Sequence, residues 1–199
     1  HGQDSLFWDA WVALVSEVLH AQSTATEVWL QSAKVRSVEL EHSTAQGRFI
    51  DVCVHTTKGV LAIENKPWLW SHDGREQLQD YARHLRAAAG TAPWTLVYLA
   101  HAGPSEHSWK EQERTMAAQQ GQFVNVPWQS MLDVLKSCLP KIQAPKVRWF
   151  VEDLVQMMEG AMGKVDNPQM LHLAGAFSKS PKTLADAFLL RNTLKQWQV

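Results

Sequence analysis

The sequence is poor in cysteine: its 199 residues include only Cys53 and Cys138, which lie far apart. Neither a disulfide framework nor a cysteine-based zinc site is therefore expected, and a reducing compartment, the cytoplasm, is the expected location. The nine histidines show no metal-ligand spacing, so His55, His72 and His84 are interpreted as ordinary surface or core-edge residues.

Long apolar runs and a charge of one sign are missing as well. No stretch approaches the roughly 18 consecutive apolar residues of a membrane-spanning helix, and residues 1–4 lack the basic segment that begins a signal peptide. The net charge of −1 provides no general electrostatic argument for a nucleic-acid partner. No nucleophile elbow, P-loop or dinucleotide fingerprint occurs either. The sequence is thus expected to form a globular domain that does not associate with membranes.

Hydrophobic periodicity predicts an α/β sandwich, in which helices flank a mixed central β-sheet. The predicted strands cover residues 26–31, 35–42, 49–55, 60–66, 95–100 and 123–128. The predicted helices cover residues 5–19, 73–89, 108–120, 129–138 and most of the chain beyond residue 140, with breaks around 160–168 and 178–181. Asp73 and Glu76 are predicted to form a capping box at the start of the second helix. Residues 1–128 are expected to form the core and residues 129–199 a helical extension packed on it.

Two of the predicted strands are joined by the segment TTKG, a pattern typical of a β-hairpin. If Thr56 lies opposite Gly59, then Asp51 lies directly opposite Glu64, with Cβ atoms roughly 4.5–5.5 Å apart. A turn with a glycine bulge would shift the register by one residue and place the two acids on opposite faces of the sheet. The sequence leaves both registers open.

The first register would create a site for a hard divalent cation. Two carboxylates at that separation repel each other unless a cation lies between them, and Mg²⁺ is commonly bound by one or two carboxylates with waters and phosphate oxygens. Lys66 projects from the same face as Glu64, about 7 Å further along the strand. Gln77 and Tyr81 share one face of the next helix and can reach back toward the hairpin. Each residue alone is typical of a solvated surface, whereas their combination favours a site.

Three motifs in this order resemble those of the PD-(D/E)XK nuclease superfamily. The sequence looks most like a branch of uncharacterised prokaryotic and phage-associated members that carry GR-x-I-D, I-E-N-K and Q-L-x-x-Y. Here the motifs read Gly47-Arg48-Phe49-Ile50-Asp51, Ile63-Glu64-Asn65-Lys66 and Gln77-Leu78-Gln79-Asp80-Tyr81. The opening HGQDSLF, the run LVYLA and the segments PWQSMLDVLKSCL and APKVRWFVEDLVQMME extend the likeness over most of the chain. The resemblance implies a restriction-endonuclease-like sandwich.

The resemblance also implies a metal site and a set of catalytic residues. Mg²⁺ or Mn²⁺ would be held by Asp51, Glu64 and the main-chain carbonyl of Asn65. The catalytic set would be Asp51, Glu64, Lys66, Gln77 and Tyr81, in which Lys66 assists the attacking water and Gln77 and Tyr81 border the substrate cleft. The implied reaction is hydrolysis of phosphodiester bonds in DNA, with RNA as a weaker option.

Several alternatives stay open at this point. Many family members use a further acidic ligand, for which the candidates are Glu17, Glu39 and Glu41, although a surface role is commoner for each. Trp68 and Trp70 either stack on the bases of a splayed strand or pack over the end of the hairpin. The rival function is a non-catalytic nucleic-acid-binding or scaffold module that retains the nuclease fold. The near-neutral charge favours it modestly, as does the lack of the segment that usually precedes the His-Gly lead in this branch. The oligomeric state, a homodimer included, is left open.

Overall fold

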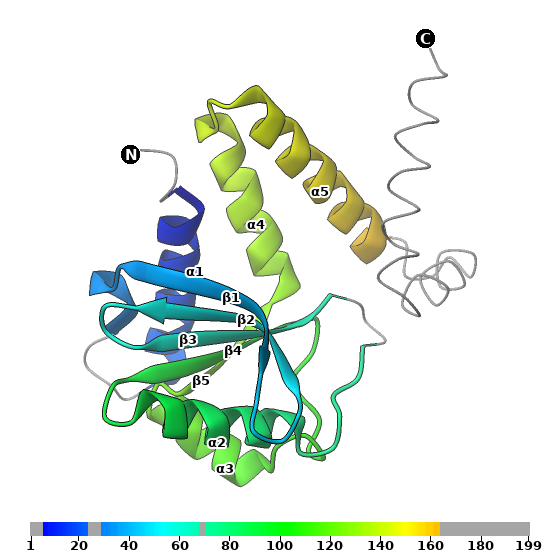
Figure 1. Cartoon of the computed structure of the whole chain (residues 1–199). Helices are drawn as coiled ribbons and strands as arrows, with labels where there is room; N and C mark the ends of the chain where they lie inside the picture. Colours follow the sequence, from blue (N-terminus) through cyan, green and yellow to red (C-terminus); the bar gives the residue numbers. More distant parts are fainter. Residues whose placement is uncertain (1–5, 24–28, 68–70, 164–199) are drawn as a thin grey trace. The chain divides into compact units, whose positions relative to one another are not determined.

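The computed structural model describes residues 6–23, 29–67 and 71–163, which contain a five-stranded mixed sheet and five α-helices (Figure 1). The strands are β1 (Val35–Ser43), β2 (Phe49–Thr56), β3 (Val60–Lys66), β4 (Trp94–Ala100) and β5 (Phe123–Pro127). The helices are α1 (Leu6–Gln22), α2 (Gln77–Ala89), α3 (Glu111–Gln119), α4 (Trp128–Cys138) and α5 (Pro145–Gly163), with short 3₁₀ turns at Trp29–Ser32 and Leu139–Lys141. The predicted α/β class is confirmed.

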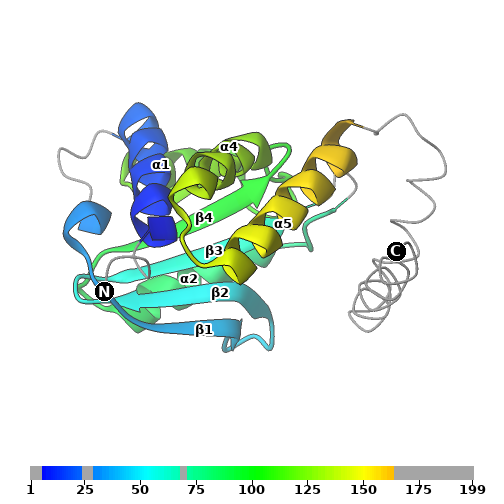
Figure 2. The ribbon, with the colours of Figure 1, turned by 90° about the horizontal axis from the view of Figure 1, so that it is seen from above.

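The sheet follows chain order, β1-β2-β3-β4-β5, and changes character at β3. The first three strands are antiparallel, whereas β3, β4 and β5 are parallel. Parallel neighbours need crossover connections, which α2 and α3 provide, and a common right-handed crossover places both helices on the same face of the sheet. Helices α1 and α4 cover the opposite face (Figures 1 and 2). The strand β4 is buried along its whole length, as predicted for its continuous apolar run.

The core beneath α2 forms as its sequence pattern predicts. Leu78, Ala82 and Leu85 are 0%, 5% and 1% exposed and belong to one apolar cluster with residues of β3 and β4. Burying these side chains against the sheet fixes the rotation of the helix about its axis. The same rotation turns the neighbouring face of α2 toward the β2–β3 hairpin.

Two predicted elements are wrong. Residues 29–32 form a 3₁₀ turn rather than part of a strand, and residues 24–28 lie outside the described part of the chain, as do Trp68 and Trp70. The capping box at Asp73 and Glu76 does not form, and α2 begins only at Gln77. The Asp73 carboxylate accepts hydrogen bonds from elsewhere instead, from the Tyr98 hydroxyl (2.6 Å) and the Ser105 amide (2.8 Å).

Contacts divide the chain into two compact units, His1–Glu152 and Asp153–Val199. The first unit contains the whole sheet together with α1 to α4. A boundary between core and extension after residue 128 remains a prediction. Among the described residues, no helix combines the length and apolar character that a membrane crossing requires.

The turn between β2 and β3 is tied to the start of β4, and this contact generates a prediction about Gly59. A Cβ at Gly59 would lie 2.0 Å from the Pro93 carbonyl oxygen, a backbone atom that cannot move aside alone. We expect Gly59→Ala to lower the free energy of unfolding by about 2 kcal/mol or more, in line with the cost of overpacking. Gly103→Ala is the matched control, because a Cβ there meets nothing within 4 Å. Urea denaturation of both variants measures the difference, and equal stabilities would contradict the packing described.

Candidate active site

The register of the β2–β3 hairpin is the one that brings the two acids together. The ladder of paired residues runs from the turn to Val52, which lies opposite Ile63. One further step along each strand places Asp51 opposite Glu64. At the turn the Thr56 amide donates to the Gly59 carbonyl (3.0 Å), and the Thr56 hydroxyl also contacts Gly59. The alternative with a glycine bulge is therefore excluded.

Glu64 is the most enclosed charged residue of the site, at 2% exposure. Its Oε1 atom forms an ion pair with Lys66 Nζ (2.7 Å) and accepts a hydrogen bond from Gln77 Nε2 (2.8 Å). Its Oε2 atom is buried and has no hydrogen-bond partner among the described residues. An unpaired buried carboxylate oxygen costs free energy, so Glu64 is held in an arrangement that leaves one oxygen available to a further group.

The Asp51 side chain contacts the end of β3. Its Oδ2 atom accepts a hydrogen bond from the Asn65 backbone amide (2.7 Å), which fixes the carboxylate beside the Glu64-Asn65-Lys66 segment. The structure thus places Asp51, Glu64, Asn65 and Lys66 at one point of the sheet. The role of the Asn65 main-chain carbonyl as a ligand remains a prediction.

Helix α2 holds both strands of the hairpin through the two polar residues predicted to reach it. Gln77 Nε2 donates to Glu64 on β3 and to the Tyr81 hydroxyl (2.9 Å), while its Oε1 atom accepts from the Gly74 amide (2.8 Å). Tyr81 in turn donates to the Phe49 carbonyl on β2. Because Tyr81 is only 1% exposed, its geometry is that of a positioning residue rather than of a side chain lining an open cleft.

The glycine and arginine of the first motif, GR-x-I-D, form a second connection between β2 and α2. Gly47 adopts φ 72° in the turn that enters β2, a left-handed conformation that favours glycine. Arg48 then donates through Nε to Asp80 Oδ2 (2.7 Å) and through a terminal nitrogen to the Arg75 carbonyl (2.7 Å). Asp80 is 5% exposed and also pairs with Arg83. This network around the buried Asp80 carboxylate fixes the strand that carries Asp51 against the helix that carries Gln77.

Asp73 is a third acid near the site, which the sequence analysis assigned only to helix capping. Its negative charge contributes to raising the pKa of Glu64. The Tyr98 hydroxyl bonds to it, and Tyr98 lies beside Glu64 in the β3–β4 register. The spacing of acidic residues along the chain did not reveal this role, because Asp73 reaches the site from a loop.

Burial and mutual repulsion shape the protonation of the site. Burial is the main cause that raises the pKa of Glu64 to about 7, and the Asp51 carboxylate adds to the increase, while Lys66 opposes it. Burial likewise raises the pKa of Asp51. It raises the pKa of Tyr81 to about 12, so this hydroxyl keeps its proton and remains a donor at neutral pH. Among the described residues whose charges act on Glu64, Asp51 and Asp73 are acids and Lys66 is the cation, so the carboxylates are only partly balanced.

These observations fit a divalent metal ion. The partnerless Oε2 atom of Glu64 and the adjacent Asp51 carboxylate are oxygen donors of the kind that Mg²⁺ and Mn²⁺ prefer. A bound cation would relieve the repulsion that raises the pKa of Glu64. The assignment of these residues as metal ligands is a proposal.

The three candidates for an additional acidic ligand differ in their surroundings. Glu39 bonds to His42 and His55. Glu41 and Glu17 are exposed, and Glu41 adopts a left-handed conformation with φ 51°. None of the three is among the causes that shift the pKa of Glu64, whereas Asp73 is.

Comparison with known proteins supports the family suggested by the motifs. A family model described as the PD-(D/E)XK nuclease superfamily matches residues 1–155. No curated protein and no solved structure matched the chain. The match spans the hairpin, α2 and the rest of the sheet.

The raised pKa of Glu64 predicts how the stability of the metal-free protein depends on pH. The folded state binds the proton more tightly than the unfolded state, whose pKa is near 4.5. Ionisation of Glu64 therefore costs folding free energy, and stability falls as pH rises from about 4.5 to about 7. We expect Glu64→Gln to abolish up to about 3 kcal/mol of this loss.

The measurement is denaturant unfolding in EDTA at pH 5 and pH 8. The difference in stability between Glu64→Gln and the wild type should shift in favour of the variant at pH 8. Glu17→Gln, which changes an exposed acid on α1, serves as the control and should show no comparable pH dependence. A Glu64→Gln effect that is the same at both pH values would contradict the assignment of a raised pKa to this residue.

Proposed function

The chain belongs to the PD-(D/E)XK nuclease superfamily, and we propose that it is a metal-dependent nuclease that hydrolyses phosphodiester bonds in DNA. The metal, Mg²⁺ or Mn²⁺, would be held by Asp51 and Glu64 with the main-chain carbonyl of Asn65. Membership of the superfamily supports a nucleic-acid substrate and a metal-dependent hydrolysis. Two free cysteines support action in a reducing compartment, the cytoplasm.

One observation carries the proposal: the buried Oε2 atom of Glu64 has no partner in the described structure and belongs to a carboxylate beside Asp51. Scaffold proteins gain nothing from a buried carboxylate pair whose ionisation is disfavoured. A metal-dependent hydrolase does gain, because a cation that binds between the oxygens offsets the repulsion between the two carboxylates.

Each residue of the site then has a defined task. A divalent ion, when bound, supplies Lewis acidity for a water nucleophile and neutralises charge on the phosphate. Lys66, fixed by its ion pair with Glu64 (2.7 Å), presents a positive charge beside the reacting phosphate and orients the water. Gln77 holds the Glu64 carboxylate, and Tyr81 holds the backbone of β2. Both are positioning residues in this proposal.

Cleavage assays with purified protein test the proposal. Plasmid, linear double-stranded DNA, single-stranded DNA and RNA are each incubated with Mg²⁺, with Mn²⁺ and with EDTA. We expect metal-dependent cleavage of DNA that falls by on the order of 10² or more in Asp51→Asn and Lys66→Ala, because each variant removes charge stabilisation at the reacting phosphate. Cleavage of RNA in preference to DNA would change the proposed substrate to RNA, whereas the proposed active-site residues would stay the same.

Lys58→Ala is the matched control for Lys66→Ala. Lys58 is an exposed lysine on the same hairpin and lies in the turn at its far end. It should leave cleavage unchanged. An absence of cleavage of all four substrates, or cleavage that survives Asp51→Asn, would instead support a non-catalytic module with the nuclease fold.

The positioning role of Tyr81 gives a separate expectation. Tyr81→Phe removes the donor to the Phe49 carbonyl and the acceptor of a Gln77 hydrogen bond without changing the charge of the site. We expect cleavage to fall by about tenfold, equivalent to one hydrogen bond of about 1.4 kcal/mol, with a raised Mn²⁺ concentration at half-maximal activity. Titration of activity with Mn²⁺ measures both. An unchanged metal dependence would show that Tyr81 does not act through the carboxylates.

A further inference from the structure

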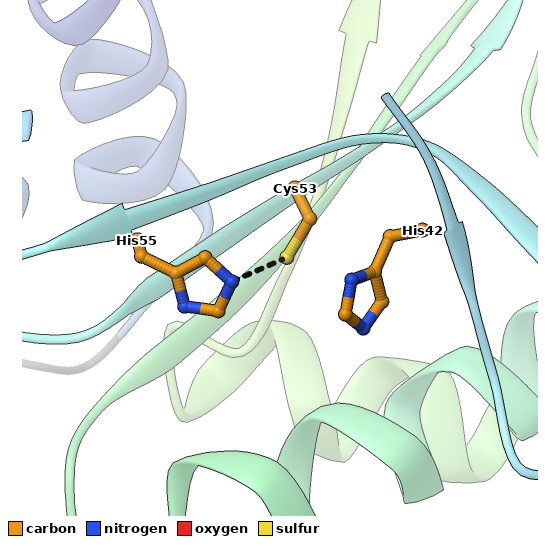
Figure 3. Close-up of side chains that lie close together, drawn as sticks. All are labelled: His42, Cys53 and His55. Carbon is orange, nitrogen blue, oxygen red and sulfur yellow. Dashed lines mark hydrogen bonds between the residues drawn. The ribbon is translucent and has the colours of Figure 1, made fainter. Parts of the chain in front are cut away.

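A second group of possible metal ligands lies on the β1–β2 ribbon, outside the carboxylate site. His42, Cys53 and His55 each offer one donor atom, and these atoms lie within 4.8 Å of one another. The close-up shows the three side chains converging from two neighbouring strands (Figure 3). No spacing in the sequence predicts this group, because strand pairing brings together residues that are distant in sequence.

Strand register and one unusual backbone conformation create the cluster. Glu39 is directly opposite Cys53, and His55 lies two residues further along β2, so the three share a face. His42 would point to the other face in a regular strand, three residues after Glu39. The left-handed conformation of Glu41 (φ 51°) breaks the alternation and brings His42 back toward Glu39.

A carboxylate and a third histidine hold the rings in place. Glu39 lies 2.6 Å from His42 Nδ1 and 3.3 Å from His55 Nε2. His84 of α2 lies 3.0 Å from His42 Nε2. With Nε2 engaged by His84, Nδ1 is the His42 nitrogen that would bind a metal, which would take the place of the proton between Nδ1 and the Glu39 carboxylate. His84 thus orients His42 from the nitrogen that faces away from the ion, as outer-shell partners of ligating histidines do. Glu39 contacts the two ring nitrogens that would bind the ion, so its place is that of a ligand.

The distances suit a tetrahedral ion. Cys53 Sγ and His55 Nε2 are 3.8 Å apart, close to the roughly 3.3–3.8 Å expected for neighbouring ligand atoms at Zn–N and Zn–S bond lengths of about 2.0 and 2.3 Å. All three donor atoms lie within 4.8 Å of one another, so small side-chain rotations bring them onto one ion. Cys53 is 1% exposed, whereas His55 is partly open to solvent, which leaves a path for the ion.

We propose that His42, Cys53, His55 and Glu39 form a Zn²⁺ site that joins β1 to β2 beneath α2. Nitrogen and sulfur donors select Zn²⁺ over Mg²⁺, which prefers oxygen. On binding, the Cys53 thiol loses its proton to solvent and the thiolate coordinates the ion. The site is separate from the proposed nuclease metal: Cys53 lies two residues, about 7 Å, from Asp51 along β2.

Cobalt substitution of the full chain tests the proposal. After removal of metal with EDTA, Co²⁺ is titrated into the protein and the absorption spectrum is recorded. We expect visible bands of tetrahedral Co²⁺ together with a near-ultraviolet thiolate-to-cobalt charge-transfer band, both displaced by one equivalent of Zn²⁺. Cys53→Ser should lose the charge-transfer band, and Glu39→Gln, which removes a charged oxygen ligand, should weaken Zn²⁺ binding by at least about tenfold, the lower end of the loss that follows removal of outer-shell partners.

Control variants separate this site from other ligands. Cys138→Ser changes the other buried cysteine, and His20→Ala changes an exposed histidine; both should keep the full spectrum. The double variant Asp51→Asn/Glu64→Gln should also keep it, so that failure of the nuclease proposal leaves this one standing. Absence of the thiolate band in the wild type would overturn the proposal, as would its persistence in Cys53→Ser or its loss only in the double variant.

X-ray absorption of the wild-type protein loaded with one equivalent of Zn²⁺ provides a test that needs no variant. One sulfur and three nitrogen or oxygen ligands are expected in the first coordination sphere. Coordination by oxygen and nitrogen alone would overturn the assignment of Cys53. Zn²⁺ should also raise the melting temperature of the wild type but not that of Cys53→Ser, since a ligand that binds only the folded state stabilises it.

Discussion

Backbone hydrogen bonds between β2 and β3 bring Asp51 and Glu64 together, and every other feature of the candidate site depends on this pairing. The carboxylates repel each other, so side-chain forces alone would separate them. The turn at Thr56 and Gly59 sets the register, and the ladder carries it to the acids. A shift of one residue would turn Glu64 and Lys66 together to the face opposite Asp51, and Asp51 would lose both its partner acid and the nearby lysine.

Helix α2 converts this pairing into a rigid site. Its apolar stripe packs on the sheet, and its polar margin reaches both strands: Gln77 bonds to Glu64, Tyr81 bonds to the backbone of β2, and Asp80 pairs with Arg48. The three motifs that looked separate in the sequence are therefore parts of one network. This arrangement costs folding free energy when Glu64 ionises, because burial raises the pKa of its carboxyl group to about 7. A structure optimised for stability alone would not keep a half-satisfied acid in its interior.

Local periodicity was sufficient to predict most of the elements, the apolar stripe of α2 and the hairpin that carries the acids. The hairpin left two registers, and a tertiary contact, the approach of Gly59 to Pro93, accompanies the one observed. The capping box was predicted wrongly because Tyr98 and Ser105 compete for Asp73, and neither is near it in sequence. The His42–Cys53–His55 group could not be predicted, since it depends on the left-handed Glu41 and on pairing across strands.

Both groups of donor atoms belong mainly to the antiparallel meander β1-β2-β3, whose strands follow one another along the chain. Contacts between residues close in sequence form sooner during folding than the parallel pairings, which must wait for a crossover helix. A chain that has folded only this meander already presents its acids, imidazoles and thiol in their final register. Metal ions present during synthesis would therefore meet the proposed ligands before β4 and β5 have assembled, and the order of folding would favour early metal capture.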